Sequence, residues 1–263
     1  MEEQGLITSF PIWAVFLATA LIVLLAIEVG YRHGKVVQSR SEEDREKEAP
    51  VGAMVGAALG LLALLLAFTF GMAEDSFQAR RVVLQQEANA IRDTYLRAQM
   101  LAEPHRTEVR SILRAYVDER LKWAEVGTHG VMPSSAALLD RLWAQTVAVG
   151  DQGQAVDIVA SFVDSVSEII KLNEERRLLR ERSRIPHAFG AVVFLIAILT
   201  FAAMGYHAGV AGTIRSPAMV AVAVVFSLVI MLIVDLNRPG QGFINVSQEP
   251  MHELRSSMAA SKP

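Results

Sequence analysis

The chain has 263 residues, a formal net charge of −3 at neutral pH and no cysteine. The small negative charge gives no reason to expect nucleic acid as a partner, and the lack of cysteine excludes disulfides and thiolate chemistry. Apolar residues make up 52% of the chain and charged residues 20%, and the charges lie mostly outside a few long apolar segments. This distribution indicates an integral membrane protein.

Four segments carry almost no charge and are each long enough, as a helix, to cross about 30 Å of hydrocarbon. They are residues 10–31, 51–72, 187–205 and 217–234. The first could be a signal peptide, but its start carries Glu2 and Glu3 in place of Lys or Arg, and no A-x-A cleavage pattern follows. Trp13 and Tyr31 bracket it as interfacial anchors do. We therefore expect four transmembrane helices, with the first one retained.

Residues 73–185, between the second and third spans, show helical periodicity and predict a helical domain. Pro104 is expected in the first turn of one helix and Ser134 or Ser135 at the N-cap of the next. The apolar positions expected to form the core are Phe77, Val83, Leu84, Ala88, Ile91, Tyr95, Leu96, Val109, Ile112, Leu113, Tyr116, Val117, Leu121, Val156, Val159, Val163, Val166 and Ile170.

The stretch LAFTFGMAEDSFQARRVV, residues 66–83, changes from apolar to amphipathic with Gly71 as its only weak helix former. We expect one helix to run without a break from the bilayer into water, with residues 154–184 as its return partner. Residues 235–263 form a tail, with a short extended piece expected at residues 242–247. The tail either packs against the helical domain or stays mobile, as termini often do.

Lys and Arg residues close to the spans are more numerous on the side of the helical domain. By the positive-inside rule, both termini and the helical domain are expected in the cytoplasm.

Two patterns stand out on the second span. Gly52, Gly56 and Gly60 recur at intervals of four, which favours close helix packing in lipid, within one subunit or between subunits. Phe68 and Phe70 lie near the end of the same span. They are candidates for a hydrophobic constriction that gates by dewetting, or they are ordinary membrane-boundary aromatics.

Two further groups are charged. Glu28 is the only ionisable residue within a span and is a possible coupling residue. A basic cluster stands just before the third span, where it either binds anionic lipid headgroups or only fixes topology. Its members are Arg176, Arg177, Arg180, Arg182 and Arg184.

Enzyme motifs are absent from the sequence: there is no H-E-x-x-H, G-x-S-x-G, P-loop or glycine-rich dinucleotide turn. His105 with Glu108, and His252 with Glu253, are too sparse for a metal site. We expect neither catalysis, nor a metal, nor a cofactor.

Three stretches together resemble the bestrophin-like domain family of bacterial membrane proteins. They are residues 61–99, 103–121 and 235–254, and their most specific parts are the E-A-N-A-I-R and D-L-N-R-P-G-x-G runs. The family is named for a remote similarity to bestrophins, pentameric anion channels with four spans per subunit and a pore lined by the second span. The resemblance implies a pentamer, and it places Phe68 and Phe70 where a bestrophin-like neck would lie. It does not extend to a bestrophin-type calcium clasp, because only Asp235 precedes Asn237-Arg238-Pro239 where the clasp has an acidic cluster.

Two functions are compatible with these features of the sequence. The first is an oligomeric membrane protein that conducts ions, with small anions favoured by the resemblance. The second is a membrane-anchored scaffold or sensor whose helical domain binds partners.

Overall fold

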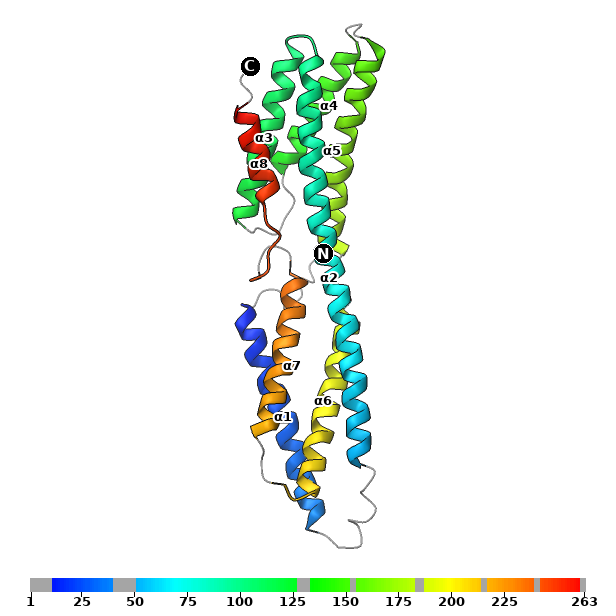
Figure 1. Cartoon of the computed structure of the whole chain (residues 1–263), viewed down its shortest axis with the longest axis vertical. Helices are drawn as coiled ribbons and strands as arrows, with labels where there is room; N and C mark the ends of the chain where they lie inside the picture. The colour runs from blue at the N-terminus through cyan, green and yellow to red at the C-terminus, as the bar shows by residue number, and fades with distance from the viewer. Residues whose placement is uncertain are drawn as a thin grey trace. The chain divides into compact units, whose positions relative to one another are not determined.

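The computed structural model describes residues 11–39, 51–126, 133–151, 155–182, 187–213, 217–238 and 242–260. Within these residues every regular element is a helix (Figure 1). The predicted all-helical class is confirmed. The extended piece expected at residues 242–247 is wrong: residues 242–248 form bends and irregular backbone before the last helix. A strand needs a partner strand for its hydrogen bonds, and the described part of the chain offers none.

Four helices are long and apolar enough to cross a membrane, which confirms the predicted number of spans. They are α1 (Ile12–Gln38), α2 (Val51–Arg97), α6 (His187–Val210) and α7 (Pro217–Leu236). As the sequence predicted, α2 runs without a break through the change from apolar to amphipathic residues. It is 47 residues long, about twice the length that a bilayer requires.

The chain divides into two compact units. The first unit consists of Met1–Asp75 and Arg184–Arg238, and the second of Ser76–Ser183 and Pro239–Pro263. The boundary falls within α2, whose residues up to Asp75 belong to the first unit. All four membrane-spanning segments therefore lie in the first unit.

In the first unit, α1 packs closely against α6 because glycines face each other at the crossing. A Cβ added at Gly30 would meet the backbone of Ala202, and one added at Gly205 would meet the backbone of Ile27. Removing the side chains allows the two backbones to approach, which is how helices associate tightly in lipid. The core around this crossing consists of Val23, Ala26, Ile27, Leu62, Ala197, Phe201, Ala223 and Phe226.

The second unit contains the end of α2, the short 3₁₀ helix η3 (Ala98–Met100), α3 (His105–Val126), α4 (Pro133–Gly150), α5 (Val156–Arg182) and α8 (Glu249–Ala260). All six apolar residues predicted to face the core from α3 are buried. On α5 the prediction was partly wrong, because Val156 is 80% exposed at the helix start while Phe162 and Ile169 are buried. Leu96, near the end of α2, is also exposed.

One helix start differs from expectation, and the structure also describes the tail. Helix α4 begins at Pro133, so Ser134 and Ser135 lie inside the helix and neither is its N-cap. Proline suits this first position because its missing N–H would have no partner there. The tail, whose packing the sequence left open, forms α8 and buries Met251, Leu254 and Met258 in the core of the second unit.

Candidate functional site: the faces of α2 and a buried polar network

The membrane-spanning part of α2 has three distinct faces. Only one of them is buried against its own unit, through Val55, Leu62, Thr69 and Ala73. In the apolar part of α2 just 11% of residues are buried, compared with 28–33% in the other three spanning helices. Within the described residues α2 is therefore the spanning helix least covered by its own subunit.

The second face of α2, here called the small-residue face, carries Gly56, Gly60, Ala63 and Ala67, all exposed. Their spacing of four and three residues keeps them on one line of the helix. A Cβ added at Gly56 or Gly60 would meet nothing within 4 Å among the residues that the structure describes. Gly52, one turn earlier, differs: a Cβ there would lie 2.8 Å from Nε2 of His207 on α6.

The third face, here called the large-residue face, exposes Met54, Leu61, Leu64, Phe68 and Met72. Phe68 is 61% exposed, whereas Phe70 is half-buried. Two residues apart on a helix, their side chains point about 160° away from each other. Phe70 instead continues the line of the small-residue face, three residues after Ala67. The structure therefore does not bring the two predicted neck residues to one side.

Thr69, between these two aromatics in the sequence, already has a hydrogen-bond partner for its hydroxyl. Thr69 lies on the buried face and its Oγ1 donates a hydrogen bond to the backbone oxygen of Leu65, 2.6 Å away. Glu28 on α1 is also engaged, since its Oε1 lies 2.7 Å from Nε of Arg32, one helical turn later. Glu28 thus forms an ion pair along its own helix.

The structure separates the members of the predicted basic cluster. Arg177 is exposed and pairs with Glu174 at 2.7 Å. Arg180 stacks on Trp123, with its guanidinium carbon 3.5 Å from the ring centroid, and Arg176 turns into the bundle. The side chain of Arg182 and the whole of Arg184 lie outside the described residues.

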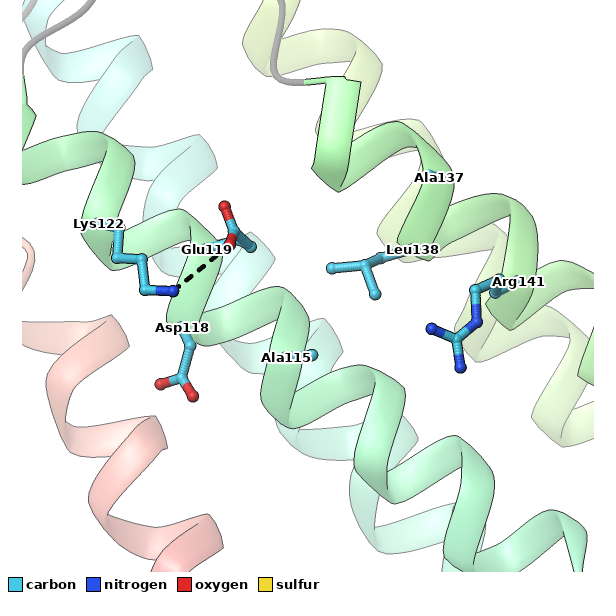
Figure 2. A pocket seen from close by; sticks show the side chains of 7 residues that line it. All are labelled: Ala115, Asp118, Glu119, Lys122, Ala137, Leu138 and Arg141. Atoms are coloured by element: carbon cyan, nitrogen blue, oxygen red, sulfur yellow. Dashed lines mark hydrogen bonds and ion pairs between the residues drawn. The ribbon is translucent and has the colours of Figure 1, made fainter.

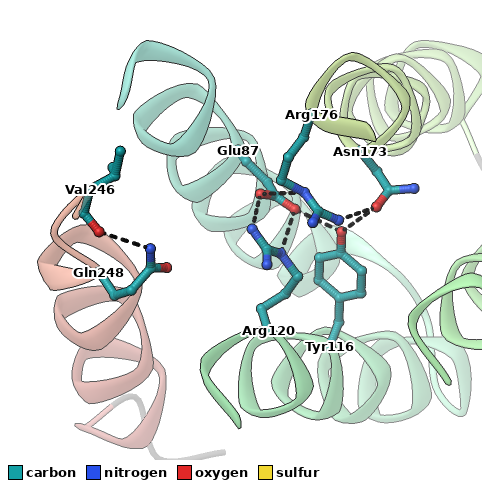
Figure 3. A network of polar contacts seen from close by, with 7 residues as sticks. All are labelled: Glu87, Tyr116, Arg120, Asn173, Arg176, Val246 and Gln248. Carbon is teal, nitrogen blue, oxygen red and sulfur yellow. Dashed lines mark hydrogen bonds and ion pairs between the residues drawn. The ribbon is translucent and has the colours of Figure 1, made fainter. Parts of the chain in front are cut away.

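Arg176 reaches a buried polar network centred on Glu87 of α2 (Figure 3). Arg120 of α3 binds both carboxylate oxygens of Glu87, with Nε 3.0 Å from Oε1 and Nη2 2.8 Å from Oε2. The hydroxyl of Tyr116 donates to Oε1 over 2.8 Å. Nε of Arg176 lies 3.5 Å from Oε2, and its Nη2 donates to Oδ1 of Asn173 over 2.6 Å. The network therefore connects three helices of the second unit.

The charges of this network shift the pKa values of its members. Burial alone would raise the pKa of Glu87, but Arg120 and Arg176, together with hydrogen bonds from Arg120 and Tyr116, lower it to about 2. Burial, together with the neighbouring charges of Arg176 and Arg120, lowers the pKa of Arg180 to about 10. Glu87 stays ionised, and Arg180 lies in a locally positive field.

Glu87 is not among the site residues predicted from the sequence, although a signal for it was present. Glu87 falls one helical turn after Val83 and one turn before Ile91, so it interrupts an apolar stripe with an acid. Burying a lone carboxylate is costly, so an acid at such a position predicts a cationic partner. The partners come from distant parts of the sequence and carry no local pattern.

A surface groove of about 460 Å³ lies between α3 and α4 (Figure 2). Its lining residues are Ala115, Asp118, Glu119, Lys122, Ala137, Leu138 and Arg141. The charges in it are paired: Lys122 with Glu119, Arg141 with Glu108, and Asp118 with Arg255. We assign it no ligand, since its charged groups already have partners on the protein.

The fold is similar to that of bacterial bestrophins. Two crystal structures of variants of a bacterial bestrophin homologue from Klebsiella pneumoniae match with TM-scores of 0.64 and 0.62, at 14% and 15% identity. Each match covers 95% of this chain and 98% of the other. A third crystal structure, described only as a membrane protein, matches with a TM-score of 0.62 at 14% identity, covering 95% and 97%. At such low identity these matches show the fold alone.

Comparison with curated proteins gave no match. The model of one protein family, the Bestrophin-like domain, matches residues 20–251, which is most of the chain and includes parts of both units. A match of this extent agrees with the four spanning helices and with the shared fold. The chain belongs to the Bestrophin-like domain family.

Proposed function

We propose that this protein forms a homo-oligomeric ring in the bacterial inner membrane and conducts small anions through a central pathway lined by α2. The observation that carries the proposal is the poor coverage of α2 by its own subunit. Membership of the Bestrophin-like domain family supports it. The excess of Lys and Arg near the spans on one side supports a cytoplasmic position for both termini and for the second unit.

The small-residue face of α2 is the face we propose to line the pathway. Glycine and alanine side chains leave room for ions and water. The same line continues beyond the apolar segment into exposed Glu74, whereas the large-residue face presents only bulky apolar side chains and suits a neighbouring subunit or lipid. Phe70 stands at the end of the small-residue face. A ring of Phe70 side chains there would form a hydrophobic constriction of the kind that gates by dewetting.

The test is anion flux into liposomes containing the purified protein. Phe70→Ala widens the proposed constriction, so we expect the flux to rise severalfold. Phe68→Ala is the matched control, because it removes the same side chain from the opposite side of the same helix, and we expect flux within about twofold of the unchanged protein. Equal effects of the two variants, or none, would show that Phe70 forms no constriction. An intact ring without any flux would instead favour a membrane-anchored scaffold.

Glu28 provides a separate check on the type of transport. Because it is paired with Arg32 on its own helix, we expect Glu28→Gln to leave passive anion flux unchanged. A proton-coupled carrier would depend on an ionisable group within a span. If flux follows an imposed pH gradient and is lost in this variant, the protein is a coupled transporter rather than a channel.

A further inference from the structure

Two arginine side chains of the second unit contact a single carboxylate, and a third arginine lies one helical turn away from one of them. Arg120 and Arg176 both contact Glu87, and Arg180 lies four residues after Arg176 on α5, which puts the two side chains on neighbouring turns of one helix face. Among the described residues no carboxylate pairs with Arg180. The cluster therefore holds three positive charges and one negative charge in partly desolvated surroundings. Of the acids on these two helices, Glu174 pairs with Arg177 and Glu119 contacts Lys122.

Arg180 is held in a way that leaves its donors available. Its guanidinium lies over the face of Trp123, an arrangement that uses the flat face of the group and leaves the N–H groups at its edge free. The side chains of Arg180 and Trp123 are both half-buried, so the site is open to solvent on one side. An edge of this kind is suited to a bidentate contact with an oxyanion.

Arg176 has an unsatisfied donor in the same cluster. Its Nε is buried without a hydrogen-bond acceptor, and the nearest oxygen of Glu87 lies 3.5 Å away. Glu87 already accepts three hydrogen bonds at 2.8–3.0 Å, from Arg120 and Tyr116, and its contact with Nε of Arg176 is longer than any of these. Buried donors are normally paired, and a charged one left without an acceptor costs free energy.

We propose that the second unit binds a phosphate group between Arg176 and Arg180. The positive charge of Arg120 would add to the attraction without direct contact. A phosphate dianion would balance the two excess positive charges, and its oxygens would accept hydrogen bonds from both guanidinium groups. The phosphate belongs either to a soluble compound or to the headgroup of an anionic lipid. The proposal concerns the second unit and does not rest on anion conduction through the first.

Binding is measured with the full-length protein in two arms. In the first arm, pyrophosphate is titrated into detergent-solubilised protein by calorimetry, at constant ionic strength. In the second arm, the protein is placed in nanodiscs of phosphatidylcholine with or without phosphatidic acid, and bound lipid is counted by native mass spectrometry. Pyrophosphate binding supports a soluble ligand, and selective retention of phosphatidic acid supports a lipid headgroup.

Arg180→Gln is the test variant and Arg177→Gln its matched control. Both remove one positive charge from α5, and Arg180→Gln keeps the contact between Glu87 and Arg120, so the bundle is expected to stay folded. We expect Arg180→Gln to weaken binding by about tenfold or more, the range for a lost charge-assisted hydrogen bond, and Arg177→Gln to change it by less than about twofold. Trp123→Leu removes the stacking surface and is expected to weaken binding to a smaller degree.

Two results would overturn the proposal. One is the absence of binding in both arms with the unchanged protein. The other is equal weakening by Arg180→Gln and Arg177→Gln, which would mean that the anion responds to the charge of α5 as a whole rather than to a site.

Discussion

Glu87 is completely buried, and its carboxylate is contacted by side chains from two other helices. Bidentate pairing with Arg120 satisfies both oxygens, which is the geometry in which a buried ion pair can recover the cost of leaving water. The apolar stripe of α2 predicts that this position is buried. Its partners were not predictable, because Arg120 and Arg176 lie on separate helices. In the sequence, Arg120 resembles an ordinary surface arginine, and Arg176 belongs to a basic cluster that points to lipid or to topology.

The lowered pKa of Glu87 predicts a pH dependence of stability. The pKa falls from an ordinary value of 4.5 to about 2 in the folded protein, so the ionised carboxylate stabilises the fold above pH 4.5. This contribution, about 3 kcal/mol, is lost as the pH falls from about 4.5 to 2. Thermal unfolding of the second unit, followed by circular dichroism across this range, measures the loss.

The variant Glu87→Gln isolates this contribution. At neutral pH it leaves Arg120 and Arg176 without a counter-charge, and we expect it to lower the free energy of unfolding by about 3–5 kcal/mol. The exposed pair of Glu108 with Arg141 provides the control, because Glu108→Gln is expected to cost less than about 1 kcal/mol. A pH profile of Glu87→Gln that still falls as steeply below pH 4.5 would assign the effect to other groups.

At the scale of the elements, the periodicity of the sequence predicts where the helices lie but not which faces meet. The three glycines at intervals of four on α2 are the longest such pattern in the sequence, yet a Cβ added at Gly56 or Gly60 would meet nothing within 4 Å among the described residues. The close crossing uses α1 and α6, where Gly30 with Gly34, and Gly205 with Gly209, each form a single G-x-x-x-G that extends beyond the predicted span. A glycine pattern shows that a helix can be approached closely, and the partner depends on the fold of the whole unit.

This difference predicts opposite results for the same substitution at two glycines. Gly205→Val places a side chain against the backbone of Ile27, and we expect it to lower the free energy of unfolding by about 1–3 kcal/mol. A Cβ at position 60 meets nothing within 4 Å in the described part of the subunit, so we expect Gly60→Val to leave thermal stability unchanged but to reduce anion flux, because the side chain would project into the proposed pathway. Dissociation of the oligomer by Gly60→Val would instead place this face between subunits.

The last helix shows the same limit of prediction from sequence. Its apolar residues Met251, Leu254 and Met258 recur at helical spacing, yet the segment follows an irregular stretch and is short, so its packing stayed open. In the structure, Arg255 pairs with Asp118 of α3 at 2.7 Å, and the backbone oxygen of Met258 accepts a hydrogen bond from the hydroxyl of Tyr95 over 3.3 Å. Such contacts between distant segments hold α8 on the bundle.

At the scale of the whole molecule, the proposal requires a closed ring. One subunit has a mass of 28.7 kDa, so a ring of five would have a mass of about 144 kDa, and closed cyclic symmetry permits such an assembly. Native mass spectrometry of the purified protein in detergent or nanodiscs measures this directly. We expect the pentamer as the main species, and a monomer or dimer would leave no ring to enclose a pathway.

The three faces of α2, in a chain that has no cysteine, make the helix open to chemical mapping. A single introduced thiol would be the only one on each subunit, so its reactivity would report one position. Thiols on a water-lined face would react with charged, membrane-impermeant reagents, and thiols between subunits would cross-link under oxidation. Thiols facing lipid would do neither. Scanning residues 51–72 in this way would show which side of the helix faces water, which faces a neighbouring subunit and which faces lipid.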